Sequence, residues 1–130
     1  MHVRRPNEED DRVEGTNTPN EIYLRIIDHL RKTYELQHPL FHIYSQGEES
    51  SFKEVFNMSD IVLHLNKPIE VTFPSFVFAD ILVTSQSSFS YAAALISDHL
   101  IYYMPFWHPP LPLPNWIILD SKNSIIQATL

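Results

Sequence analysis

The sequence predicts a single α/β domain over residues 1–130, with a parallel β-sheet covered by helices on both faces. The chain has 130 residues, 44% of them hydrophobic, which is enough for one domain with its own core. Short apolar segments rich in branched and aromatic residues alternate with segments of helical periodicity. Because the strands lie too far apart along the chain for hairpins, the pattern is typical of βαβ units.

The most clearly marked element is a helix that begins near Pro19. Thr18 is the expected N-cap, Pro19 the first helical residue, and Glu21 completes a capping box three residues after Thr18. The polar segment 6–17 before it is predicted to be a loop, and Pro39 to end the helix region. Apolar residues at helical spacing predict one buried stripe: Ile22, Tyr23, Ile26, Ile27, Leu30 and Tyr34.

The rest of the chain continues the alternation of strands and helices. Strands are predicted at 40–45, 61–65, 81–84, 100–104 and 116–119, and helices at 50–56, 70–79, 89–97 and in the tail from Asn123. Segment 70–79 contains Pro74, which is compatible with the first turn of a helix.

Composition excludes several classes of function. With 9 basic and 16 acidic residues the chain carries a net charge of −7, which argues against binding to nucleic acid or an anionic membrane. The absence of cysteine excludes disulfides and thiolate zinc sites, and the 7 histidines are scattered without an HExxH motif, so we predict no metal and no cofactor. No apolar segment approaches a membrane span, and a soluble, cytoplasmic protein is favoured.

A serine-rich turn follows the predicted strand 81–84. In a parallel sheet the next helix directs its free N–H groups and the positive end of its dipole at this turn. A phosphate group would be held there by backbone amides and by Ser87, Ser88 and Ser90. The alternative is that Ser87 or Ser88 is simply the N-cap of the helix.

Two adjacent arginines and an acidic segment near the start of the chain are further candidates. Arg4 and Arg5 offer a bidentate fork for phosphate or carboxylate, or else form surface ion pairs with the acids that follow. Asp10, Asp11 and Glu14 include candidates for a general base, although such an acidic loop is more often only solvated. The sequence has no glycine-rich dinucleotide or P-loop motif.

Four segments in this order resemble the α1,2/α1,6 fucosyltransferase superfamily: His2-Val3-Arg4-Arg5, and residues 15–19, 41–47 and 79–90. The resemblance implies a GT-B-like enzyme whose carboxyl-terminal, Rossmann-like domain binds GDP-fucose. The chain would then be this nucleotide-sugar-binding domain, without the amino-terminal half of the enzyme and without part of the first strand.

The resemblance also implies roles for individual residues. Arg4 and Arg5 would hold the phosphates of GDP-fucose, His2 would lie by the guanine, and Ser88 would meet the β-phosphate. Asp10, Asp11 or Glu14, with Asp10 as the first choice, would take the proton of the acceptor hydroxyl. Two positions depart from the family pattern: Asn7 stands where the family has an acid. Glu70 is the nearest match to the acid that would read the guanine, whereas simple counting gives Thr72.

We therefore expect a fucosyltransferase-like domain that binds GDP-fucose, or a similar nucleotide sugar, for transfer to a glycan hydroxyl with inversion and without a metal. The partners implied are the nucleotide sugar, the glycan acceptor and the missing amino-terminal domain. The alternative is a non-catalytic Rossmann-like remnant or interaction module that binds no nucleotide.

Overall fold

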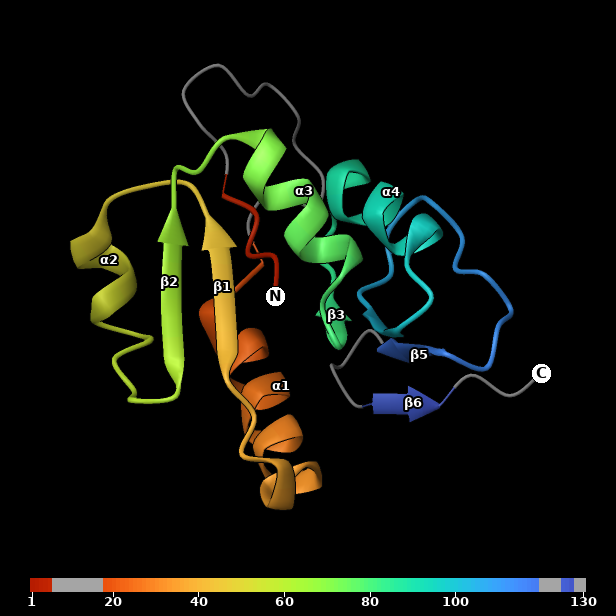
Figure 1. Ribbon diagram of the computed structural model, residues 1–130, viewed down its shortest axis with the longest axis horizontal. Coiled ribbons are helices and arrows are strands. Elements are labelled where there is room, and N and C mark those ends of the chain that lie inside the picture. The colour runs from red at the N-terminus through yellow and green to blue at the C-terminus, as the bar shows by residue number, and fades with distance from the viewer. Residues whose placement is uncertain (6–17, 120–124, 128–130) are drawn as a thin grey trace.

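The computed structural model describes residues 1–5, 18–119 and 125–127, and it confirms an α/β fold (Figure 1). The helices are α1 (Asn20–Thr33), α2 (Glu49–Lys53), α3 (Ile69–Val77) and α4 (Ser88–Ile96), and a short 3-10 turn spans Glu35–Gln37. The strands are β1 (Phe41–Ser45), β2 (Ile61–Leu65), β3 (Ile81–Val83), β4 (Leu100–Tyr103), β5 (Trp116–Leu119) and β6 (Ile125–Gln127). Strands and helices alternate from α1 to β4, as the sequence predicts.

The amino-terminal residues join two ladders of strands. β1 and β2 pair in parallel, β3, β4 and β5 pair in parallel, and β6 is antiparallel to β5. Between β1 and β3, the His2 N–H donates to the Val83 carbonyl (2.9 Å) and the Val3 N–H donates to the Tyr44 carbonyl (3.0 Å). The strand order is therefore β2-β1-(1–3)-β3-β4-β5-β6. This order is compatible with a doubly wound, Rossmann-like sheet, whose switch point lies between residues 1–3 and β3.

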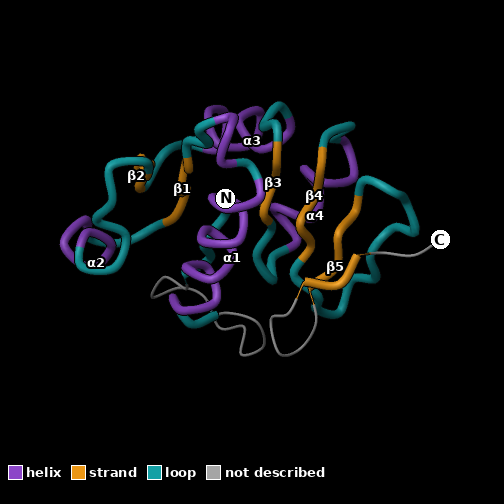
Figure 2. Tube along the Cα trace, turned by 90° about the horizontal axis from the view of Figure 1, so that it is seen from below, coloured by secondary structure: helices purple, strands orange, loops and turns teal. Residues whose placement is uncertain are grey.

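Helices cover both faces of the sheet, and Figure 2 shows α1 and α3 on opposite sides of the strands. Residues of α1 and α2 and those from one face of the strands form one core: Met1, Val3, Tyr23, Ile26, Ile27, Leu30, Phe41, Ile43, Phe52, Phe56, Val83, Tyr102, Met104 and Leu119. α3, α4 and the opposite face form the second: Phe76, Leu82, Ala93, Ala94, Ile101, Tyr103 and Trp116. Leu82 and Val83 enter different cores because successive strand side chains point to opposite faces.

The start of α1 differs from the prediction. The helix begins at Asn20, Pro19 occupies the N-cap position, and no side chain caps the helix. Thr18 is buried and its hydroxyl donates to the sulfur of Met104 at 3.6 Å. The predicted capping box is therefore wrong, because the Thr18 hydroxyl bonds a side chain of the core instead of the start of the helix.

Two further predictions are wrong. Residues 125–127 form β6 rather than a helix, with Ile126 opposite Ile118; the branched residues Ile125 and Ile126 favour an edge strand. Pro74 is the sixth residue of α3 instead of lying in its first turn. A proline there removes one backbone donor from the helix.

Candidate functional site

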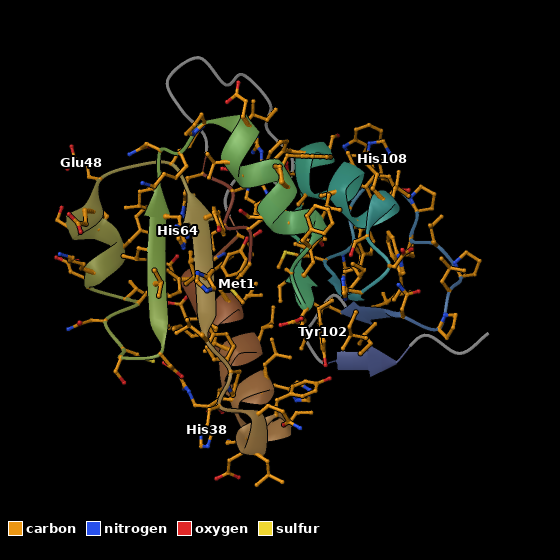
Figure 3. The ribbon with its side chains drawn as sticks, viewed as in Figure 1. Met1, His38, Glu48, His64, Tyr102 and His108 are labelled. Carbon is orange, nitrogen blue, oxygen red and sulfur yellow. The ribbon has the colours of Figure 1, made fainter. Side chains whose placement is uncertain are left out.

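A pocket of about 340 Å³ lies at the switch point of the sheet. It is bounded by the residues that follow β1 and β2, by the segment after His2 and by the start of α4, and in Figure 3 His64 marks its β2 side. Its lining residues are His2, Val3, Arg4, Arg5, Tyr44, Ser45, Gln46, His64, Lys67, Ile69, Thr72, Ser87 and Phe89. Ligands of open α/β sheets bind at this edge.

A second, larger hollow of about 820 Å³ lies at the opposite ends of β1 and β3. Its walls are mostly apolar and include Leu30, Phe41 and Phe78. None of the predicted site residues in the described part of the chain lines it, so the pocket at the switch point is the candidate site.

His2 is a neutral ring enclosed by other rings. Its Nδ1 lies 2.8 Å from the Ser85 hydroxyl, and its ring lies 5.2 Å from that of Phe76 and 5.9 Å from that of Phe89. Burial, with positive charges nearby as a smaller cause, lowers the pKa of His2 to about 3. At neutral pH the imidazole is therefore a stacking and hydrogen-bonding group and carries no charge.

Arg4 and Arg5 both line the pocket, but their surroundings differ. Arg4 is buried. The Arg5 guanidinium donates to the carbonyls of Arg4 (3.0 Å) and Thr18 (3.1 Å) and to Oδ1 of Asn20. Arg5 thereby ties the start of α1 to the rim of the pocket, and these bonds involve both of its terminal nitrogens.

The three serines of the predicted phosphate site lie in three different environments. Ser87 lines the pocket and is the N-cap of α4, since its Oγ accepts from the Phe89 N–H at 3.2 Å. Ser90 is fully buried and its Oγ accepts from the Ser85 N–H at 3.2 Å. Ser88 is exposed; its Oγ lies 3.2 Å from Nε2 of His108, in the loop that Figure 3 shows beside α4, and it does not line the pocket.

The predicted acids lie elsewhere or outside the described residues. Glu70 is exposed in the first turn of α3 and does not line the pocket, whereas its neighbours Ile69 and Thr72 do. Asp10, Asp11 and Glu14 belong to residues 6–17, which lie outside the described part of the chain. The structure therefore does not show where the predicted general bases lie relative to the pocket.

Sequence reasoning missed the β2 side of the pocket. The His64 ring stacks on Tyr44, with centroids 4.4 Å apart, and its Nε2 lies 2.9 Å from Nδ1 of His42. Burial and, next, the charge of His42 lower the pKa of His64. Strand alternation is the signal that could have found this side, because residues two apart on paired parallel strands share a face, and a helical spacing of histidines does not reveal such a pair. Lys67 precedes Pro68 shortly after β2, and in the sequence such a pair indicates only the end of a strand.

The arrangement is suited to binding an anion. Basic side chains, the positive end of α4 and a neutral aromatic surface meet in one pocket. Among the described residues no group of three or more His, Cys, Asp or Glu side chains is placed to hold a metal ion. In that same part of the chain, no helix has the length and apolar character needed to cross a membrane.

Comparisons of the chain with models of protein families, with curated proteins and with solved structures find no match. The functional interpretation is therefore drawn from the geometry of the pocket and from the resemblance of the motifs.

Proposed function

We propose that the chain is the nucleotide-sugar-binding domain of a fucosyltransferase-like, GT-B glycosyltransferase, with GDP-fucose or a similar nucleotide sugar as its ligand. One observation supports this most directly: His2, Arg4 and Arg5 line one pocket at the switch point together with Ser87, which lies far from them in the sequence. Nucleotides bind at that point in sheets of this kind.

The pocket suggests how each part of the nucleotide sugar would be bound. The diphosphate would face the basic side chains and the start of α4, where the N–H groups of Ser88 and Ser90 donate to no acceptor among the described residues. The neutral His2 ring, between Phe76 and Phe89, would lie by the guanine.

The proposed reaction is an inverting transfer without a metal. A carboxylate, Asp10 or Glu14, takes the proton of a glycan hydroxyl, and the hydroxyl oxygen attacks the anomeric carbon of the sugar. The bond to the diphosphate breaks, and fixed donors meet the charge that develops on the leaving group. The acceptor would be bound with the help of an amino-terminal domain.

Another observation favours the second candidate, a non-catalytic Rossmann-like remnant or interaction module. The terminal nitrogens of Arg5 are directed at the start of α1, and Ser88 faces the loop after β4. Two of the residues that the resemblance assigns to phosphate binding thus have structural contacts in this chain.

Calorimetric titration with GDP, GDP-fucose and UDP separates the two candidates. We expect saturable binding of the guanine nucleotides, with UDP at least about tenfold weaker. Gln46→Trp places a bulky ring at the pocket and should weaken GDP binding at least about tenfold, which is about 1.4 kcal/mol. Gln37→Trp, at another exposed glutamine outside this pocket, is the matched control. A folded chain that binds no nucleotide at millimolar concentration would overturn the proposal.

A further inference from the structure

Three basic side chains line the pocket of a chain that is acidic as a whole. They are Arg4, Arg5 and Lys67, in a protein with a net charge of −7. Their concentration at one place is therefore local and points to an anionic ligand. The three side chains differ in their burial and in the bonds that their charged groups already make to the protein.

Lys67 is the most exposed of the three basic side chains and belongs to none of the ion pairs among the described residues. Arg4 is buried, and the Arg5 guanidinium donates to three protein oxygens. Lys67 is exposed. The ion pairs found within residues 1–5, 18–119 and 125–127 are Arg31–Asp60, Lys32–Asp28 and Lys53–Glu49, and none of them includes Lys67.

The backbone on both sides of Lys67 is fixed. Asn66 has a positive φ of 58°, and its N–H donates to the carbonyl of Ser45 at 2.9 Å. The Asn66 side chain makes two bonds to Gly47: Oδ1 accepts from its N–H and Nδ2 donates to its carbonyl, each at 3.0 Å. Pro68, with φ −68°, follows Lys67 directly and is the N-cap of α3. The turn is thus tied to the end of β1, which keeps the lysine at the pocket.

We infer that Lys67 is the cation that binds the anionic group of the ligand, that this group is a diphosphate, and that Arg5 has a structural role. The inference rests on the proposed function for the identity of the nucleotide, but it concerns the diphosphate alone. Ser87 lines the same pocket and places the positive end of α4 beside the anion. An ammonium group is a compact charge that bonds phosphate oxygens without needing a fixed planar geometry.

Titration with inorganic pyrophosphate, which has neither base nor sugar, tests the inference. Lys67→Ala should weaken pyrophosphate binding at least about tenfold and make the affinity less dependent on salt, because one charge is lost. Lys67→Arg should restore most of the affinity. Lys53→Ala, at an exposed lysine paired with Glu49 on α2, should change it less than about twofold. The thermal midpoint of Lys67→Ala should stay that of the parent, and that of Arg5→Ala should fall.

The outcomes distinguish this inference from the proposed function. Equal pyrophosphate affinity in the parent and in Lys67→Ala overturns the inference, as does a folded parent that binds no pyrophosphate at millimolar concentration. Binding that depends on Lys67 but shows no preference for GDP over UDP supports the inference and contradicts the proposed nucleotide. GDP-selective binding that is unchanged in Lys67→Ala supports the function and contradicts the role of the lysine.

Discussion

Gly47 occupies a backbone conformation that other residues rarely adopt. Its φ is +135°, and a Cβ at this position would lie 3.1 Å from Cε2 of Phe52. Gly47→Ala should therefore lower the free energy of unfolding by about 1–3 kcal/mol, through backbone strain and a tight contact in the core. Urea denaturation measures the change. Ser51→Ala, on the exposed surface of the neighbouring α2, should stay within about 0.5 kcal/mol, and an equally small change in Gly47→Ala would contradict the strain.

His2 makes the stability of the chain dependent on pH. Its pKa in the folded chain is about 3, against 6.5 for an ordinary histidine. Below pH 6.5 the unfolded chain binds a proton that the folded chain does not bind, so stability is lost as the pH falls from 6.5 toward 3. The maximum slope is about 1.4 kcal/mol per pH unit. His2→Asn should reduce the slope between pH 7 and 5 in thermal melts, and a variant with the parent slope would rule out His2 as a source of it.

Helix α4 depends on one capping residue. The Ser87 hydroxyl accepts the Phe89 N–H at 3.2 Å, and α4 has no acidic residue in its first turn that would stabilise its positive end. Ser87→Ala should lower the free energy of unfolding by about 1 kcal/mol. Ser88→Ala removes the same group one residue later, where it is exposed and contacts the half-buried His108, and should change stability by less than about 0.5 kcal/mol. Equal losses in urea denaturation would contradict the assignment of the cap.

The elements that the sequence predicts well are those set by periodicity. The stripe of α1 is buried at Tyr23, Ile26, Ile27 and Leu30, and β2 spans the predicted residues 61–65. Helix starts are less predictable, because Thr18 has two possible partners and only the folded chain brings Met104 within reach of its hydroxyl. The prediction of a helix in the tail is wrong for a similar reason, since pairing with β5 decides the conformation of residues 125–127.

At the scale of the whole molecule, the sheet topology is what made part of the site predictable. Parallel strands end at one edge, which brings the segment after His2 and the turn before α4 together, and Arg4, Arg5 and Ser87 do line one pocket. The position of Ser88 was not predictable, because it depends on how the loop after β4 folds back to His108. Lys67 was missed because a Lys-Pro pair after a strand is also the ordinary signal for its end.

The sheet also connects the two cores. Met1 and Val3 share a core with Ile43 of β1, while the backbone of His2 bonds β3, whose Leu82 enters the second core with Trp116. Damage to one core should therefore destabilise the other, as in a single two-state transition. Ile43→Ala, at a fully buried side chain, should lower the free energy of unfolding by about 2–5 kcal/mol.

Trp116 is the reporter for this prediction, because it is 1% exposed in the second core. The other tryptophan, Trp107, is 70% exposed and is replaced by phenylalanine to isolate the signal. In that background, Ile43→Ala should shift the urea midpoint of Trp116 fluorescence and that of far-UV circular dichroism by the same amount, and exposed Ile96→Ala should leave both nearly unchanged. A fluorescence midpoint that stays at its parent value while the dichroism midpoint falls would mean that β1-β2 and β3-β4-β5-β6 unfold separately, and that the bonds of residues 1–3 do not couple them.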